Sequence, residues 1–388
     1  MPLLQVPEIS LRVMSLNMQF GAGSESKEKR FLLHQAPQEQ DHNLDNIVNL
    51  IDEINPDIIC LQEVEFCSSR TGFVNQAQEI IQRLAKKQER EPYHLETGTC
   101  LEFDEKRLER FWKVARFLYQ EERSQWIFKK LGIDKQELPK EKIKIDFGNA
   151  ILSRYPLKEK DHDFFIPPYW SPLMDINIIR RKDERKSWLV CRVNYHPEIA
   201  EKVPLFIYNI HLENNDEENR KLQSKILYNK LSKRKDAHKI LTMDGNAEPL
   251  GADYELESGV KDESLERLLR HPEMRYFPGI YPQPEREPPQ YFATYPSHQP
   301  SQILDTILVS EYLEITNYRI HPTKVSDHLA VIADIKINAD LVQENILKQI
   351  VNPLIETPEN ETPNRSRAAG YHVKTCGELA GSCLDLGS

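Results

Sequence analysis

The sequence predicts an α/β fold built around one large core. Short apolar runs rich in Ile, Leu and Val recur along the 388-residue chain, and such runs are typical of buried strands. Between several of these runs, apolar residues recur at the spacing of an amphipathic helix. The order strand, helix, strand is the arrangement of α/β proteins. The chain is longer than a usual single domain, but large α/β folds reach this length, so we expect one large domain with appendages.

The first predicted strand and helix lie near the N-terminus. An apolar run at residues 11–17 predicts the strand, and a polar loop with glycines follows it. Helical spacing over residues 44–54 predicts a helix that begins at Asp41 or Asn43, because short polar side chains cap helix N-termini. Pro56 is expected to end this helix.

The later elements follow the same two patterns. We expect a proline-rich loop at residues 270–300, where no period survives. Helices are predicted at residues 75–87 and 222–231. Strands are predicted at 57–61, 143–146, 150–152, 188–193, 205–211, 303–309 and 329–337, and in the apolar run of 240–249.

Two segments differ from this pattern. Residues 102–145 are charged and aromatic, with apolar residues on one helical stripe, and they predict a helical insert that forms a wall of the cleft or is simply solvated. Residues 164–170 predict a rigid aromatic loop that stacks on a base, enters a lipid interface or packs in the core. We expect a main domain at 1–340 that contains the insert, and a C-terminal region at 341–388 with one helix and a polar, disordered tail.

Charge and cysteine content narrow the class of protein. The net charge of −10, from 51 basic and 61 acidic residues, argues against an extended basic groove for nucleic acid, although a metal ion can supply positive charge instead. The six cysteines show no paired spacing, which fits free thiols in a reducing compartment. Without a signal sequence or a long apolar stretch, the chain is expected to be soluble and cytoplasmic, and secretion by a signal-independent route stays open.

Six of the apolar runs deliver an acidic, amide or imidazole side chain where the strand is expected to stop. A polar side chain is tolerated there because it leaves the sheet for a cleft. Six such ends at one sheet edge would form an acidic pocket with two imidazoles, which suits a hard divalent cation and a phosphate ester. The six segments are 11–20 with Asn17, 57–65 with Glu63, 205–213 with Asn209 and His211, 240–249 with Asp244 and Asn246, 302–310 with Asp305, and 326–333 with Asp327 and His328.

The carboxylates indicate a metal site. Glu63, Asp244 and Asp327 each follow an apolar run and have no Lys or Arg within two residues. Oxygen ligands of this kind, helped by the amides of Asn17 and Asn246, suit Mg²⁺ or Mn²⁺, whereas zinc prefers more His or Cys. Taken singly, each carboxylate is more often a solvated loop residue. Six polar ends in the same context favour the metal site.

The two histidines are candidates for proton transfer and phosphate contact. The unperturbed pKa of imidazole lies near neutrality, and His211 and His328 each lie beside an apolar run. A lone histidine in such a place is more often structural. Asp327 precedes His328, and Asp305 lies in the preceding predicted strand, where a carboxylate can hold one imidazole in a fixed tautomer.

Taken in order, these motifs form a set that is more specific than any single one. In chain order they are Asn17, Gln62-Glu63, residues 148–157 (Gly-Asn-Ala-Ile-Leu-Ser-Arg-Tyr-Pro-Leu), Asn209-Ile210-His211-Leu212, Asp244-Gly245-Asn246, residues 294–297 (Thr-Tyr-Pro-Ser) leading to Leu304-Asp305, and Ser326-Asp327-His328. The set resembles the endonuclease/exonuclease/phosphatase superfamily, over residues 11 to about 337. The resemblance implies a DNase I-like, four-layer α/β/β/α sandwich with two packed mixed β-sheets and one metal-dependent phosphoesterase site.

The resemblance also implies roles for individual residues. Glu63 would be the principal ligand of Mg²⁺ (or Mn²⁺), with Asn17 and Asp327 nearby. The remaining roles, in chain order, would be phosphate contact by Arg185, for which Arg181 and Arg192 compete, substrate binding by Asn209, proton donation by His211, alignment of water and phosphate by Asp244 and Asn246, orientation of an imidazole by Asp305, and contact with a phosphoryl oxygen by His328.

The sequence departs from the superfamily pattern in two places. The usual Gly-Asp-Phe-Asn is here Met243-Asp244-Gly245-Asn246, and the arginine or aromatic residue common around the orienting aspartate is replaced by Leu304 and Thr306. Neither change touches a catalytic side chain, so they affect the expected substrate contacts more than the expected chemistry.

The function expected from the sequence is a divalent-metal-dependent phosphoesterase that hydrolyses a phosphodiester or phosphomonoester by in-line attack of water. A nuclease on DNA or RNA and a phosphodiesterase on lipids or inositol phosphates are alternatives, because a fold does not select a substrate. Two further hypotheses are a binding protein with an inactive site and a secreted effector. The sequence leaves open the substrate, the number of metals, the oligomeric state and the role of the tail.

Overall fold

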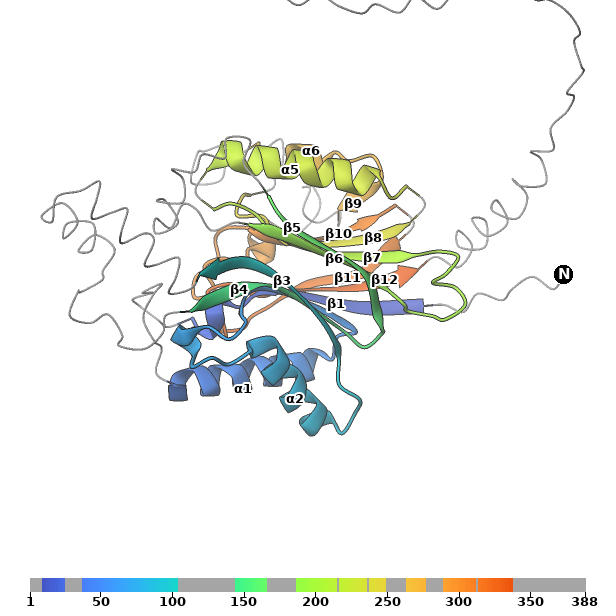
Figure 1. The fold of residues 1–388 in the computed structure, drawn as a ribbon. Helices are drawn as coiled ribbons and strands as arrows, with labels where there is room; N and C mark the ends of the chain where they lie inside the picture. Colours follow the sequence, from blue (N-terminus) through green and yellow to red (C-terminus); the bar gives the residue numbers. More distant parts are fainter. Residues whose placement is uncertain are drawn as a thin grey trace, which may run out of the picture. The chain divides into compact units, whose positions relative to one another are not determined.

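The fold is seen in a computed structural model that describes residues 9–24, 37–103, 144–165, 186–214, 216–235, 237–248, 263–276, 289–311 and 313–337. Two six-stranded β-sheets pack face to face, and helices cover their two outer faces (Figure 1). The four-layer α/β/β/α sandwich expected from the sequence is therefore confirmed.

The first sheet contains the N-terminal strands and the last two strands of the described chain. Only β1 and β2 in it are parallel neighbours, and its other pairs are antiparallel, so the sheet is mixed. Its strands in spatial order are β11 (Leu313–His321), β12 (Ala330–Ile337), β1 (Ile9–Asn17), β2 (Ile58–Glu65), β4 (Ile145–Ser153) and β3 (His94–Phe103).

The second sheet is mixed in the same way, with β7 and β8 as its parallel pair. Its strands in spatial order are β5 (Leu157–Phe164), β6 (Ser187–Val193), β7 (Leu205–His211), β8 (His238–Asp244), β10 (Asp305–Ser310) and β9 (Met274–Tyr276). Each parallel pair lies inside its sheet, where both faces are covered.

Three apolar clusters hold the layers together. Val13, Ile207 and other buried side chains fill the space between the sheets. A second cluster packs α1 (Pro37–Ile54) and α2 (Gln76–Gln88) on the first sheet, and a third packs α5 (Glu217–Ser232) and α6 (Glu266–Leu269) on the second. Short 3₁₀ turns lie at Gln19–Gly21 (η1), Ser69–Thr71 (η2) and Pro289–Phe292 (η4).

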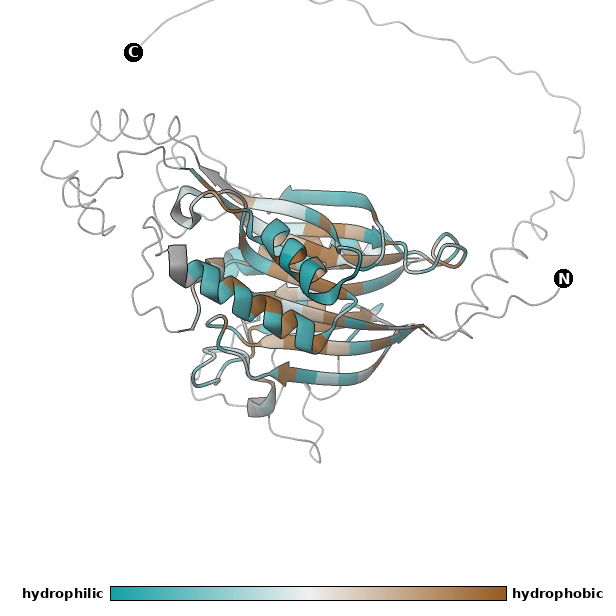
Figure 2. Ribbon diagram, turned by 90° about the horizontal axis from the view of Figure 1, so that it is seen from below, coloured by the Kyte–Doolittle hydropathy of each residue, from teal (hydrophilic) through white to brown (hydrophobic). Residues whose placement is uncertain are grey.

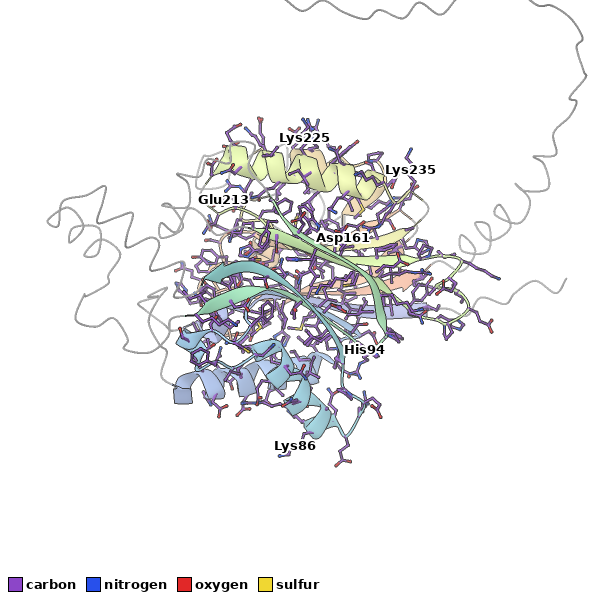
Figure 3. The ribbon with its side chains drawn as sticks, viewed as in Figure 1. Lys86, His94, Asp161, Glu213, Lys225 and Lys235 are labelled. Carbon is purple, nitrogen blue, oxygen red and sulfur yellow. The ribbon has the colours of Figure 1, made fainter. Side chains whose placement is uncertain are left out.

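The polarity of each layer matches its position. In Figure 2 the sheet interiors are predominantly hydrophobic, and the outward side of the helices is hydrophilic. Lys225 on α5 and Lys86 on α2 point outward from opposite outer layers (Figure 3). Each helix buries one apolar stripe against a sheet and exposes its opposite, polar side to solvent. This is the arrangement expected for amphipathic helices on the outer faces of the sandwich.

The polar residues expected at strand ends do lie at one edge of the sandwich, but not always where a strand stops. Asn17, His211 and Asp244 end their strands, as expected. Asp305 begins β10, and His328 lies just before β12. The expectation that these two residues follow a strand was therefore wrong, because they precede one. Since β10 is antiparallel to β8 and β12 is antiparallel to β1, the starts of β10 and β12 lie beside the ends of β8 and β1.

The elements that the sequence did not predict are mostly edge strands. β3, β5 and β11 each lie at the edge of a sheet, and β5 carries the charged run 158–161 with mostly exposed side chains. Edge strands carry polar residues more readily than central strands, so they lack the apolar run that predicts a strand. In addition, the strands expected at 143–146 and 150–152 are one strand, β4.

The helix expected from Asp41 or Asn43 begins earlier, at Pro37, where the fixed φ of proline suits a first helical turn. It ends at Ile54, followed by Asn55 with φ 51° and then Pro56, as the sequence indicates.

Several expectations fall on other residues. Arg181, Arg185, most of the aromatic loop 164–170, the insert between residues 104 and 143, the helix after residue 341 and the tail lie outside the described residues. The domain boundaries thus stay predictions. Within the described ranges, no helix has the length and apolar content needed to cross a bilayer.

Gly148 in β4 offers a test of the packing of the first sheet. A Cβ atom at this position would lie 2.0 Å from the backbone oxygen of Gly98 and 2.7 Å from the nitrogen of Cys100, where β3 departs from regular register. We expect Gly148→Ala to lower the free energy of unfolding by about 3 kcal/mol, because backbone atoms would have to move. Urea unfolding of the purified proteins measures this change.

Gly72→Asn serves as the control. Unlike Gly148, Gly72 has a positive φ, 63°, which asparagine tolerates, and apart from its two chain neighbours no atom of the described residues lies within 4 Å of the added Cβ position. We expect a change within about 0.5 kcal/mol for this variant. Equal stability of Gly148→Ala and the parent protein would show that β3 and β4 do not approach this closely.

Candidate active site

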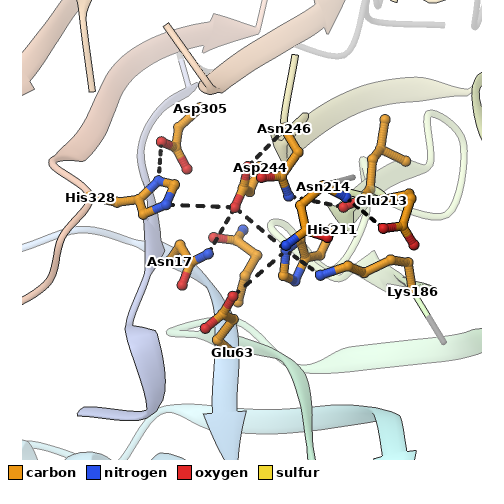
Figure 4. A network of polar contacts seen from close by, with 12 residues as sticks. Asn17, Glu63, Lys186, His211, Glu213, Asn214, Asp244, Asn246, Asp305 and His328 are labelled. Carbon is orange, nitrogen blue, oxygen red and sulfur yellow. Dashed lines mark hydrogen bonds and ion pairs between the residues drawn. The ribbon is translucent and has the colours of Figure 1, made fainter. Parts of the chain in front are cut away.

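The candidate active site lies at the edge of the sandwich where polar ends of both sheets meet (Figure 4). The first sheet contributes Asn17 from β1, Glu63 from β2 and His328 from the turn before β12. The second sheet contributes His211 from β7, Asp244 from β8 and Asp305 from β10. These six residues, distant in sequence, form one network of polar contacts.

Asp244 is at the centre of this network and is almost fully buried. Its Oδ2 accepts a hydrogen bond from Asn17 Nδ2 at 2.8 Å. The same oxygen lies 3.5 Å from His211 Nε2 and 3.9 Å from His328 Nε2, so it faces both imidazoles. Burial raises the pKa of the Asp244 carboxyl, with the positive charge of His328 acting against this effect.

Asp305 and His328 form a buried acid–imidazole pair. The Asp305 Oδ2 and His328 Nδ1 atoms are 2.7 Å apart, and both side chains are buried. Burial alone would lower the pKa of His328, but the charges of Asp305 and Asp244 and the hydrogen bond to Asp305 outweigh it and raise the pKa above its usual value. His328 is therefore an imidazolium at neutral pH, with Nε2 directed toward Asp244.

The position of Glu63 depends on an irregularity in β2. Pairing between β2 and β4 shifts register between Leu61 and Val64, and Glu63 within this bulge has φ 53°. A bulge redirects a side chain relative to the regular strand, and strained backbone of this kind concentrates at functional sites. The Glu63 side chain stays 17% exposed, and its Oε1 lies 3.9 Å from His211 Nε2. It is thus accessible at the site while its neighbours in β2 are buried.

Lys186, a residue that the sequence analysis did not single out, also belongs to the site. It is 2% exposed, and its Nζ lies 2.9 Å from His211 Nε2. Because β6 is antiparallel to β7, the start of β6 lies beside the end that carries His211. Burial, together with the charges of Lys186 and His328, holds the pKa of His211 well below its usual value. Its neighbour Arg185, predicted for phosphate contact, lies outside the described residues.

Arg192, the competing arginine within the described ranges, is not at the site. It makes ion pairs with Glu159 and Glu201 at 2.7 and 3.0 Å, near the end of β6 remote from His211. These contacts account for its charge without a substrate.

Asn246 and Asn17 mainly support Asp244. The backbone nitrogen of Asn246 donates to Asp244 Oδ1, and its Nδ2 donates to the carbonyl of Leu212. Asn246 has φ 46°, a conformation that asparagine tolerates better than most residues. Asn17 Oδ1 accepts from the backbone nitrogen of Gln19, which turns the Nδ2 group toward Asp244.

Asn209, predicted to bind substrate, lies behind the site and between the sheets. It is fully buried, and its Nδ2 donates to the carbonyls of Leu61 and Ala150 in the first sheet at 2.9 Å. Its Oδ1 accepts from Gln62 Nε2. These contacts leave no exposed atom for a substrate, so the structure gives Asn209 the role of joining the two sheets beneath the site.

Asp327 and Tyr295 lie on the rim. Asp327 is half-buried, and its carboxylate accepts a hydrogen bond from Ser326. The ring of Tyr295 packs against His328 with centroids 4.9 Å apart. Burial, and the charges of Asp327, Asp244 and Glu63, raise the pKa of the Tyr295 phenol, which therefore stays protonated beside the carboxylates.

The donor set at this edge fits a hard cation. Carboxylate oxygens of Glu63, Asp244 and Asp327 and the amide oxygen of Asn17 are ligands that Mg²⁺ or Mn²⁺ prefers. Asp244, Asp305 and His328 also each offer a ligand atom, all within 4.8 Å of one another. Since Asp305 and His328 are hydrogen-bonded to each other, we regard these two as an acid–imidazole pair and not as ligands.

Comparisons with known proteins agree with this fold. The structure resembles an endonuclease/exonuclease/phosphatase from Beutenbergia cavernae (16% identity, TM-score 0.54, covering 85% of this chain and 72% of that chain). It also resembles a family protein from Bacteroides thetaiotaomicron (11%, 0.51, 86% and 99%) and the human Nocturnin catalytic domain, solved with a bound sulfate anion (17%, 0.50, 86% and 97%). At these identities the likeness shows the fold alone.

A search of curated proteins found no match. The model of the endonuclease/exonuclease/phosphatase family, in contrast, matches residues 14–328, which include every residue of the site from Asn17 to His328. The chain belongs to the endonuclease/exonuclease/phosphatase family.

Proposed function

We propose that the protein is a divalent-metal-dependent phosphoesterase that hydrolyses a phosphodiester or phosphomonoester by in-line attack of water. The observation that supports this most strongly is the network around Asp244, in which both sheets bring buried acids and imidazoles to one edge. Burying several charged groups together is unfavourable unless they are paired, and such clusters are typical of functional sites.

Glu63 would hold the metal, with Asn17 and Asp327 as further oxygen ligands. A bound Mg²⁺ or Mn²⁺ would supply a Lewis acid that offsets charge on a phosphoryl oxygen. The exposed fraction of Glu63 and the bulge that aims it support this assignment. Asn17 Oδ1 accepts one hydrogen bond, so a second lone pair is available for a cation.

Asp244 would orient the attacking water. Its Oδ1 is held by the backbone of Asn246 and its Oδ2 by Asn17, so the carboxylate cannot rotate freely. The raised pKa of Asp244 suits a group that accepts the proton of that water.

His328 would donate a hydrogen bond from Nε2 to a phosphoryl oxygen. Asp305 keeps the proton on Nδ1 and stabilises the imidazolium, which complements the charge on the phosphoryl group. The superfamily resemblance implied that His211 also donates a proton. Its lowered pKa means that His211 is neutral at neutral pH, so we assign the donating imidazolium to His328 alone.

The substrate class is tested by a panel. Purified full-length protein with Mg²⁺ should release product from a bis-aryl phosphodiester and from one class among single-stranded DNA, duplex DNA, RNA, sphingomyelin, phosphoinositides and soluble phosphomonoesters. The negative net charge favours substrates that need no extended basic groove. Absence of hydrolysis across the panel, with metal bound to the protein, would favour a binding protein with a dead site.

Metal removal should abolish the activity. Because oxygen ligands bind Mg²⁺ weakly and exchangeably, we expect EDTA to reduce turnover of the bis-aryl phosphodiester to background and excess Mg²⁺ or Mn²⁺ to restore it. Initial rates before EDTA, after EDTA and after metal addition measure this effect. Turnover that persists in EDTA would contradict a metal-dependent mechanism.

A further inference from the structure

Lys186 and His211 form a buried pair that neither the family match nor the motif set assigns. Lys186 Nζ and His211 Nε2 are 2.9 Å apart, with exposures of 2% and 1% (Figure 4). A lysine ammonium has three donors and no acceptor. The contact is a hydrogen bond only if Nε2 offers its lone pair, so the single ring proton of a neutral His211 must be on Nδ1.

Other contacts of His211 favour the opposite tautomer. Asp244 Oδ2 and Glu63 Oε1 lie 3.5 and 3.9 Å from Nε2, and both would attract a proton on that nitrogen. Within the described residues Nδ1 is buried and has no hydrogen-bond partner. An unpaired buried donor is destabilising, so the Nδ1–H form needs another source of stabilisation.

The hydrogen bonding of His211 differs from that of most histidine sites. In most histidine sites the partner of one ring nitrogen decides which nitrogen is protonated, as Asp305 does for His328 through Nδ1. His211 has its partner on Nε2, and that partner is a donor. A hydrogen bond from a charged donor is stronger than one between neutral groups, so the bond from Lys186 is the source of stabilisation that the Nδ1–H form needs.

We propose that Lys186 is a positioning residue that keeps His211 Nε2 unprotonated, with the ring proton on Nδ1. His211 then presents to Asp244 an acceptor nitrogen already occupied by Lys186, and it does not donate to the Asp244 carboxylate. Asp244 keeps its lone pairs for water, and the positive charge of Lys186 stays at this side of the site. The catalytic consequence rests on the proposed function, whereas the tautomer does not.

Nuclear magnetic resonance tests the tautomer directly. Full-length protein labelled with ¹⁵N-histidine should give, at neutral pH, the long-range ¹H–¹⁵N pattern of an Nδ1–H imidazole for His211, identified by its loss in His211→Gln. In Lys186→Met the pattern should change to the Nε2–H form, because Asp244 and Glu63 then attract the proton. An Nε2–H pattern in the parent protein, or an Nδ1–H pattern that persists in Lys186→Met, would overturn the proposal.

Two further variants separate this role from mere stability. Lys239 is an equally buried lysine, paired with Glu273 at 2.6 Å, in β8 at the opposite end from Asp244. Lys239→Met should lower stability and leave the His211 signals unchanged. Lys186→Arg keeps a charged donor and should keep the Nδ1–H pattern, which also tests the proposal if Lys186→Met does not fold.

Activity provides the second readout. We expect Lys186→Met to lower kcat for the bis-aryl phosphodiester by about 10- to 100-fold, the usual effect of a residue that orients a catalytic group, with partial rescue in Lys186→Arg. A kcat within twofold of the parent in Lys186→Met would overturn the positioning role. The resonance experiment needs no turnover, so a failure of the proposed function is distinguished from a failure of the tautomer.

Discussion

Replacing Glu63 with glutamine is expected to lower kcat for a bis-aryl phosphodiester by about 1000-fold, equivalent to about 4 kcal/mol of transition-state stabilisation. Glutamine has nearly the same shape as glutamate but no charge, so the variant removes the principal anionic metal ligand and leaves the bulge of β2 in place. Initial rates at saturating Mg²⁺, with circular dichroism to confirm the fold, measure this effect.

Glu159→Gln is the matched control for Glu63→Gln. Glu159 also has a positive φ, 48°, and also lies in a register shift, between Lys158 and Asp161 of β5. Its carboxylate pairs with Arg192 at the surface instead of facing the site. We expect its kcat within twofold of the parent. Equal rates for Glu63→Gln and Glu159→Gln would show that Glu63 is not a metal ligand needed for turnover.

The Asp305–His328 pair should behave as one functional unit. We expect His328→Gln to lower kcat by about 1000-fold and Asp305→Asn by about 100-fold, within the range typical of acid–base groups. The double variant should be no worse than His328→Gln, because Asp305 acts only through the imidazole that it holds at 2.7 Å. A cycle of kcat values for the parent, the two single variants and the double variant measures this coupling.

Asp334→Asn is the control for that cycle. Asp334 lies in β12 and is paired with Arg12 at 2.6 Å. The substitution therefore removes the carboxylate of a comparable ion pair that lies away from the site. Its effect on kcat should be within twofold and additive with that of His328→Gln. If the losses from Asp305→Asn and His328→Gln multiplied, so that the double variant were about 100,000-fold slower, the two residues would act independently and the pair would not be the unit described here.

The sequence predicts the layers of this fold because the central strands carry a clear signal. β7 and β8 are buried throughout and β1 and β12 over most of their length, so each is rich in apolar residues, and a polar residue next to such a run marks a sheet edge. For this reason Asn17, His211 and Asp244 could be assigned to one site from single-chain patterns. The exposed edge strand β5 gives no such signal.

The remaining features depend on tertiary contacts that have no sequence signal. Glu63 reaches the site through a bulge, and bulges are not visible in an apolar pattern. In the sequence, Lys186 is one of several charged residues in a row, and nothing distinguishes it from them. The antiparallel pairing of β6 with β7 brings it to His211. Asn209 lies on the same face of β7 as His211 but two residues further from the strand end, so it meets the carbonyls of Leu61 and Ala150 between the sheets instead of the site.

The most direct test of the metal site is an anomalous difference map from crystals of the full-length protein grown with Mn²⁺. We expect a peak at about 2.2 Å from a carboxylate oxygen of Glu63, within reach of Asn17 or Asp327, and no such peak in Glu63→Gln. A peak confined to other carboxylates, or a Glu63 side chain directed away from Asp244 with no ion beside it, would contradict a phosphoesterase centre at this edge of the sandwich.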